Sequence, residues 1–184
     1  MRSRCSVRHV PLFIALTPFQ VVPGKFKGEA GLSQLREGRA AYRATGAELL
    51  RSVFLGLLAE SYAQGGQFEA GLATVVEALG VVESTGEQEY EAELYRLKGD
   101  LLLQQSQTQH AEAEDCFEQA IAIAQRQAAK SWELRAATSL ARLWQGQGKT
   151  TEERELLAPV YNWFTEGFDT ADLKDAKTLL DGLS

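Results

Sequence analysis

GEAGLSQLREGRAAYRATGAE, at residues 28–48, is repeated further along the chain as FEAGLATVVEALGVVESTGEQ, at residues 68–88. The two stretches are identical at seven of 21 aligned positions. The pattern returns, stretched by two residues, at AEAEDCFEQAI (111–121), and again at TEERELLAPVY (151–161). A period of about 40 residues is typical of arrays of stacked helix pairs, in which each unit buries its apolar face against its neighbours. The chain is therefore predicted to be an all-α solenoid.

Small and large residues recur at fixed positions of this repeat. One small position is occupied by Ala59, Gly99 and Ala141, and three residues later come Tyr62, Leu102 and Trp144. A second small position holds Gly31, Gly71, Ala113 and Glu153, and four residues later come Leu35, Val75, Phe117 and Leu157. Small residues allow two helices to approach closely, and the large ones fill the space beside them. Glu153 breaks the pattern, which predicts either a splayed last pair or a Glu153 side chain that reaches solvent.

This spacing resembles the tetratricopeptide repeat, in a long variant of about 40–42 residues. The resemblance implies a right-handed superhelical solenoid of antiparallel helix pairs with a C-terminal capping helix. The predicted organisation is an irregular or mis-started leader over 1–27, repeats over 29–168 and a capping helix over 169–184. Within the repeats we predict a half repeat at 29–45 and helix pairs at 47–84, 88–127 and 130–165. The aromatic residues Trp163 and Phe164 are expected in the core.

Composition argues against two classes of partner. Residues 1–51 hold nine Lys/Arg against three Asp/Glu, whereas residues 52–184 hold ten against 22. Such an acidic body is unsuited to nucleic acid, whose phosphates require clustered cations. The apolar run near the N-terminus is too short to span a bilayer and is interrupted by prolines, so we expect no membrane insertion. Two cysteines, Cys5 and Cys116, give no disulfide framework, and a cytoplasmic protein is predicted.

No catalytic residue, metal site or cofactor is predicted. The only histidines are His9 and His110, and a metal site at His110 with Glu112 or Glu114 is conceivable but lacks a second histidine. GQGKT, at 146–150, lacks the upstream glycine of a phosphate-binding loop and lies at a turn between two predicted helices. We therefore predict a protein without enzymatic activity of its own.

The predicted functional surface is the groove of the superhelix. In tetratricopeptide arrays the first helix of each pair lines the concave groove, and the resemblance places nine polar residues there: Glu60, Gln64, Glu93, Arg96, Asp100, Gln104, Arg135, Arg142 and Gln145. A groove of mixed charge suits an extended peptide held by polar contacts, or a neighbouring domain of a longer parent protein. These side chains are equally compatible with an ordinary exposed helix surface.

Three segments carry a more specific resemblance. They are AELYRLKGDLLL (92–103), AEAEDCFEQAIAIAQRQAAKSWELRAATSLARLWQGQGK (111–149) and LLAPVYNWFTEGFDTADLKDAKTLL (156–180). They resemble the C-terminal repeats of bacterial signalling proteins in which an adenylate/guanylate cyclase-type domain precedes an AAA/STAND-type ATPase domain. The resemblance implies a protein-interaction scaffold that serves as the sensory or regulatory tail of such a protein.

Two other interpretations remain open at this point. The chain could be a fragment of a nucleotide-dependent enzyme or regulator whose catalytic domains lie upstream. Alternatively, it could be a structural module that self-associates into a homodimer, because helix 29–45 lacks its expected partner on one flank.

Overall fold

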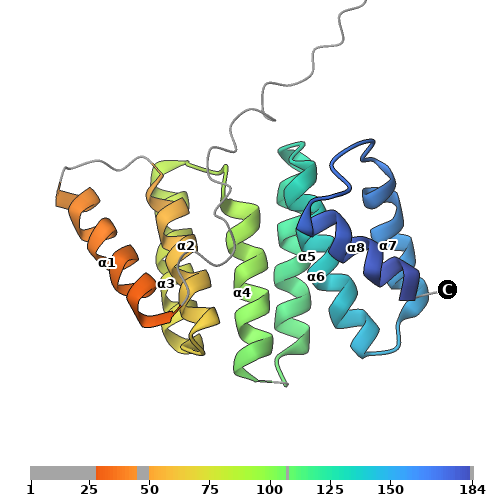
Figure 1. Ribbon diagram of the computed structural model, residues 1–184, viewed down its shortest axis with the longest axis horizontal. Coiled ribbons are helices and arrows are strands. Elements are labelled where there is room, and N and C mark those ends of the chain that lie inside the picture. The colour runs from red at the N-terminus through yellow and green to blue at the C-terminus, as the bar shows by residue number, and fades with distance from the viewer. Residues whose placement is uncertain (1–27, 45–49, 107, 183–184) are drawn as a thin grey trace, which may run out of the picture.

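The computed structural model describes residues 28–44, 50–106 and 108–182, and within these ranges every regular element is a helix. The all-α prediction is confirmed, while the predicted leader lies outside the described residues. In Figure 1 the chain proceeds from α1 on the left to α7 on the right, and α8 turns back to lie across α6 and α7. The bounds of the helices are α1 Gly28–Ala44, α2 Arg51–Gln64, α3 Phe68–Thr85, α4 Glu91–Gln105, α5 His110–Arg126, α6 Lys130–Gly146, α7 Thr150–Asn162 and α8 Ala171–Gly182.

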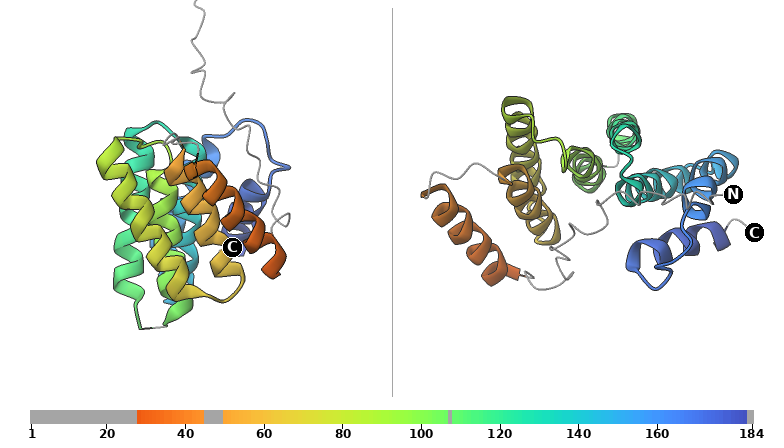
Figure 2. Two further views of the ribbon diagram at one scale, coloured as in Figure 1. Left: turned by 90° about the vertical axis from the view of Figure 1, so that its left-hand side faces the viewer. Right: turned by 90° about the horizontal axis from the view of Figure 1, so that it is seen from above.

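The helices divide into two sets by their contacts. Each helix packs against the next one along the chain. In addition, α2 contacts α4, α4 contacts α6, and α6 contacts α8, whereas α3, α5 and α7 do not contact one another. We call α2, α4, α6 and α8 the continuous row. In the right-hand view of Figure 2, α3 and α5 lie on one side of the molecule, and α1 and α8 lie on the other.

Three of the turns between helices share one backbone geometry. A left-handed residue stands second after the helix end at Gly66 (φ 70°), Ala128 (φ 53°) and Gly148 (φ 76°). In each turn the next residue donates its amide to a carbonyl five residues back, for example Gln67 to Tyr62 at 2.9 Å. Glycine adopts this conformation freely, whereas an alanine is strained there. The turn geometry therefore recurs even where the sequence supplies alanine.

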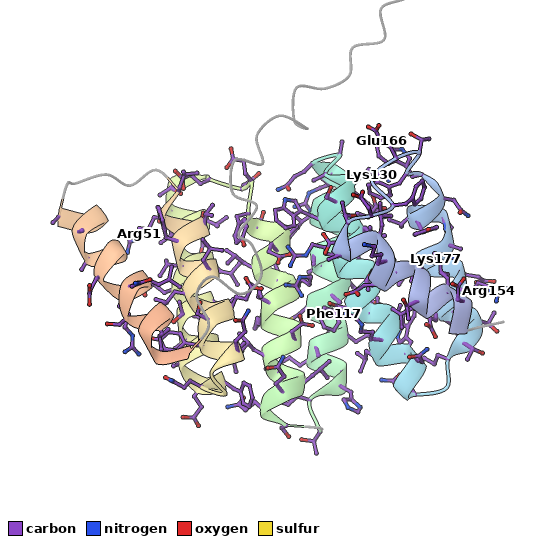
Figure 3. The ribbon with its side chains drawn as sticks, viewed as in Figure 1. Arg51, Phe117, Lys130, Arg154, Glu166 and Lys177 are labelled. Carbon is purple, nitrogen blue, oxygen red and sulfur yellow. The ribbon has the colours of Figure 1, made fainter. Side chains whose placement is uncertain are left out.

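Close approach of helices depends on the small residues of the pattern. A Cβ atom added to Gly99 in α4 would lie 2.5 Å from Cε1 of Phe117 in α5. The Phe117 ring is fully buried and points from α5 toward α4 (Figure 3). Gly71 in α3 is equally close to another helix, since its added Cβ would lie 2.8 Å from Leu101 in α4. The absence of a side chain at these positions lets the large residues fill the interface.

Two glycine substitutions test this packing. Gly99→Ala is expected to lower the free energy of unfolding by about 1–2 kcal/mol, because overpacking against the rigid Phe117 ring exceeds the gain in helix propensity. Gly80→Ala in α3 is the matched control, since an added Cβ there meets no atom within 4 Å. That control is expected to raise stability by about 0.5–1 kcal/mol. Urea unfolding of both variants measures the two signs, and stabilisation by Gly99→Ala would contradict the packing described.

Candidate interaction surface

A buried ion-pair network joins α4 and α6, two neighbouring helices of the continuous row. Glu93 in α4 is 1% exposed, and its two carboxylate oxygens accept hydrogen bonds from Arg96 at 2.7 and 2.9 Å. Arg135 in α6 reaches the same carboxylate, with Nη2 3.0 Å from Oε1. Arg96 also pairs with Asp100, one turn further along α4. Two guanidinium groups thus compensate one buried carboxylate, as a buried charge requires.

Helix α8 adds two ion pairs with α6. Arg135 Nε lies 3.8 Å from Oδ1 of Asp172, and Arg142 Nη2 lies 2.9 Å from Oδ2 of Asp175. Both aspartates belong to α8, while both arginines belong to α6. We call the whole set the charged face: Glu60, Glu93, Arg96, Asp100, Arg135, Arg142, Asp172 and Asp175. Sequence reasoning missed the two aspartates because it treated α8 only as a cap.

Two carboxylates of the charged face have perturbed protonation. Burial raises the pKa of Glu60, and the neighbouring charge of Glu93 raises it further, against the opposing effect of Arg135. Burial likewise raises the pKa of Asp100, against the effect of Arg96. Both shifts have the physical cause that low-polarity surroundings disfavour an ionised carboxylate. Glu60 in α2 therefore interacts electrostatically with the network on α4 and α6. Three helices thus contribute charges to one face.

The predicted groove residues fall into two groups. Among the charged ones, ion pairs link Glu93, Arg96, Asp100 and Arg135. Arg142 pairs instead with Asp175, and Glu60 is near the network without an ion pair to it. The three glutamines Gln64, Gln104 and Gln145 are exposed and lie near the C-terminal ends of α2, α4 and α6. The paired charged residues are therefore held by their ion pairs, while the glutamines expose their carboxamide groups to solvent.

A recess lies between α4 and α6 on the charged face. It has a volume of about 390 Å³ and is lined by Asp100, Leu103, Gln104, His110, Ser139, Arg142, Leu143 and Gly146. Two leucines give it an apolar part, and carboxylate, carboxamide, hydroxyl and guanidinium groups surround them. A few polar groups around an apolar surface are the usual composition of a ligand-binding recess.

An aromatic pair borders the charged face at the N-terminal ends of α4 and α6. The rings of Tyr90 and Trp132 meet edge to face with centroids 5.4 Å apart. The guanidinium of Arg135 lies 5.4 Å from the Trp132 ring centroid. The Tyr90 ring also packs over Gly56 of α2, where a Cβ would clash with it. Sequence reasoning missed this pair, although the glycine at position 56 is a signal of close approach.

Glu153 in α7 contradicts both sequence expectations for its position. It does not reach solvent, since the residue is 0% exposed, and α7 packs against α6. Neither carboxylate oxygen has a hydrogen-bond partner. Burial raises the pKa of this carboxyl group. The small-residue position therefore encloses the side chain whether it is small or not, and an unpaired carboxyl group is buried there at an energetic cost.

We expect Glu153→Gln to stabilise the protein in a pH-dependent way. When the pKa of a carboxyl group is higher in the folded state than in the unfolded state, raising the pH destabilises the protein. The loss begins near the unfolded-state pKa and is complete above the folded-state pKa. The isosteric amide should therefore raise the free energy of unfolding by about 1–2 kcal/mol at pH 7, with little effect near pH 4. Urea unfolding at both pH values measures this. An equal stabilisation at pH 4 and at pH 7 would mean that the charge of Glu153 is not the cause.

Two further expectations concern residues outside the charged face. Trp163, expected in the core, is 56% exposed, because α7 ends at Asn162 and the chain turns toward α8. Phe164 is partly buried and packs against the core, so that half of the expectation is confirmed.

His110 lines the recess, and within the described residues no group of three or more metal-binding side chains occurs. No helix in the described ranges has the length and apolar character needed to cross a bilayer.

Comparison with known proteins leaves the resemblances stated above as predictions. No family model matches the chain, and no curated protein matches it.

Proposed function

We propose that the chain is a tetratricopeptide-type, right-handed superhelical array without catalytic activity, which binds an extended polypeptide segment along its charged face. Two structural features support this. Antiparallel helices follow one another with a turn geometry that recurs after α2, α5 and α6. In successive pairs the first helices, α2, α4 and α6, contact each other, whereas the second helices, α3, α5 and α7, do not. A row of that kind presents a continuous surface to a partner, which repeat arrays use for binding.

The observation that carries the proposal is the set of contacts that orders the side chains of the charged face. Glu93, Arg96 and Arg135 are held by hydrogen bonds and ion pairs on two helices before any partner arrives. Binding to pre-ordered side chains requires less loss of conformational entropy than binding to mobile ones. The exposed Gln104, one turn beyond Asp100 on α4, offers both a donor and an acceptor, which can pair with the backbone of an extended segment.

The parent context is the finer part of the proposal. We propose that the array is the regulatory tail of a cytoplasmic cyclase/ATPase-type signalling protein, and that a sibling domain or separate protein supplies the bound segment. The three resembling segments support this. An alternative is self-association through α1, which is favoured by one observation: within the described residues α1 packs only against α2. Size-exclusion chromatography with light scattering separates these, since self-association requires a dimer.

A peptide-selection experiment tests the binding function. The full chain is screened against a displayed library of random peptides, and the affinity of each selected peptide is measured. The double variant Gln104→Ala/Arg142→Ala changes two residues of the recess between α4 and α6, and it is expected to weaken binding by about tenfold or more. The matched control Glu118→Ala/Gln119→Ala changes two exposed residues of α5, outside the continuous row. If only the control pair weakens binding, the charged face is not the binding surface.

A further inference from the structure

The charged face carries more carboxylates than cations. Its carboxylates are Glu60, Glu93, Asp100, Asp172 and Asp175, and its guanidinium groups are Arg96, Arg135 and Arg142. Arg96 pairs with two of the carboxylates, Arg135 joins Glu93 to α8, and Arg142 pairs within the α6–α8 contact. These pairs account for every carboxylate except Glu60. The face therefore has two negative charges in excess, and one carboxylate without an ion-pair partner among the described cations.

Glu60 is placed where a cation would improve its surroundings. The side chain is partly buried on α2; burial and the charges of Glu93 and Asp100 raise its pKa, and Arg135 and Arg96 act in the opposite direction without forming an ion pair with it. The cation on its own helix, Arg51, pairs with Glu77 of α3 at 3.5 Å, and Arg36 of α1 donates hydrogen bonds of 2.9 and 3.0 Å to the hydroxyl of Tyr62. An arriving guanidinium or ammonium group would pair with Glu60 and reduce the repulsion from its neighbours.

The recess between α4 and α6 gives a second, independent reason to expect an occupant. Asp100 contributes both to the ion-pair network and to the wall of the recess. Leu103, partly exposed in the same recess, offers an apolar surface for the methylene stem of a long side chain. A segment that extends from α2 toward α6 would thus contact the Glu60 carboxylate on α2 and the recess between α4 and α6.

We propose that the charged face binds an extended, Lys- or Arg-bearing segment of a partner protein, with one of its cations paired with Glu60. This inference rests on the proposed function and specifies the chemistry of its partner. Charge complementarity selects the occupant, because a basic segment restores the charge balance whereas an acidic one adds to the excess. Arginine is the better match, since its planar group pairs with a carboxylate through two hydrogen bonds.

The test uses the full chain and two dye-labelled peptides of equal length. One alternates Ala and Arg, and the other alternates Ala and Glu. Fluorescence anisotropy at about 0.15 M salt, where distant charges are screened, should show the Arg peptide binding about tenfold or more tightly than the Glu peptide. Glu60→Gln is expected to weaken the Arg peptide by about five- to tenfold, while the exposed Glu118→Gln on α5 leaves its affinity unchanged. Circular dichroism checks that both variants remain folded.

Three results would overturn the inference. Equal weakening by Glu60→Gln and Glu118→Gln would indicate general attraction to an acidic protein. Preference for the Glu peptide would mean that the partner segment is acidic and not basic. The third concerns residues 1–27, which contain five Lys/Arg and no Asp/Glu. If a full chain with Arg2, Arg4 and Arg8 changed to serine binds the Arg peptide more tightly, the chain's own segment competes for Glu60, and the assignment to a separate partner fails.

The outcome is distinguishable from failure of the proposed function. If the Arg peptide fails but library-selected peptides of another chemistry lose affinity in the Gln104→Ala/Arg142→Ala variant, the charged face binds peptides and only the basic partner is wrong. If selected peptides respond only to changes on α5, the binding function of the charged face fails with it.

Discussion

Phe117→Ala is expected to lower the free energy of unfolding by about 3–5 kcal/mol, one of the two largest effects that the structure implies. The ring is 0% exposed and fills the space left by Gly99 between α4 and α5. It belongs to a core cluster that extends from α4 to α8. Removing it leaves a cavity that the neighbouring helices cannot close without moving. Urea unfolding followed by circular dichroism measures the loss.

The control for this prediction is an apolar residue of the same chain that lacks burial. Val76 in α3 is 59% exposed. Val76→Ala is therefore expected to change stability by less than about 0.5 kcal/mol. A loss below about 1 kcal/mol for Phe117→Ala would contradict the role assigned to the ring, because truncation of a well-packed core aromatic exceeds that value.

Glu93→Gln is expected to lower the free energy of unfolding by about 3–5 kcal/mol, since removing one partner of a buried ion pair leaves the other charge uncompensated. Here two guanidinium groups, of Arg96 and Arg135, lose the same carboxylate. The substitution preserves the size of the side chain, so that the loss reports charge and hydrogen bonding and not packing. Thermal and urea unfolding at pH 7 both measure it.

A surface ion pair provides the matched control. Arg142 and Asp175 lie 2.9 Å apart, but their side chains are 50% and 59% exposed. Asp175→Asn is expected to reduce stability by no more than about 1 kcal/mol, because solvent screens such pairs. Equal effects of Glu93→Gln and Asp175→Asn would mean that the α4–α6 network does not hold the continuous row together.

Much of the helical packing could be predicted from spacing alone. Ala59 and Ala141 are fully buried, as are Val75 and Leu157 at the large position. The reason is that the repeat records which side of each helix meets its neighbour. In α4 a second apolar stripe, formed by Leu94, Leu97 and Leu101, is buried together with Leu102 at the repeat's large position. A helix that contacts α2, α3, α5 and α6 has few exposed sides, so that periodicity could not choose between the stripes.

The site was less predictable, for reasons that individual residues illustrate. The pairing of Arg96 with Glu93 and Asp100 follows from spacings of three and four residues on one helix. The pairing of Arg135 with Glu93 and Asp172 crosses three helices, and only their three-dimensional arrangement places those groups together. Glu153 and Trp163 were misjudged because residue type was weighed more heavily than position. At Glu153 the repeat position determined burial, whereas at Trp163 the end of α7 determined exposure.

Hydrogen exchange of the full chain, with and without a peptide selected from the library, tests most directly whether the charged face binds a polypeptide segment. We expect the peptide to slow amide exchange in α2, α4 and α6, since bound partners reduce local opening of the elements they contact. Exchange in α3, α5 and α7 should change little. Protection confined to α3, α5 and α7, with none in α2, α4 and α6, would contradict the proposed binding surface.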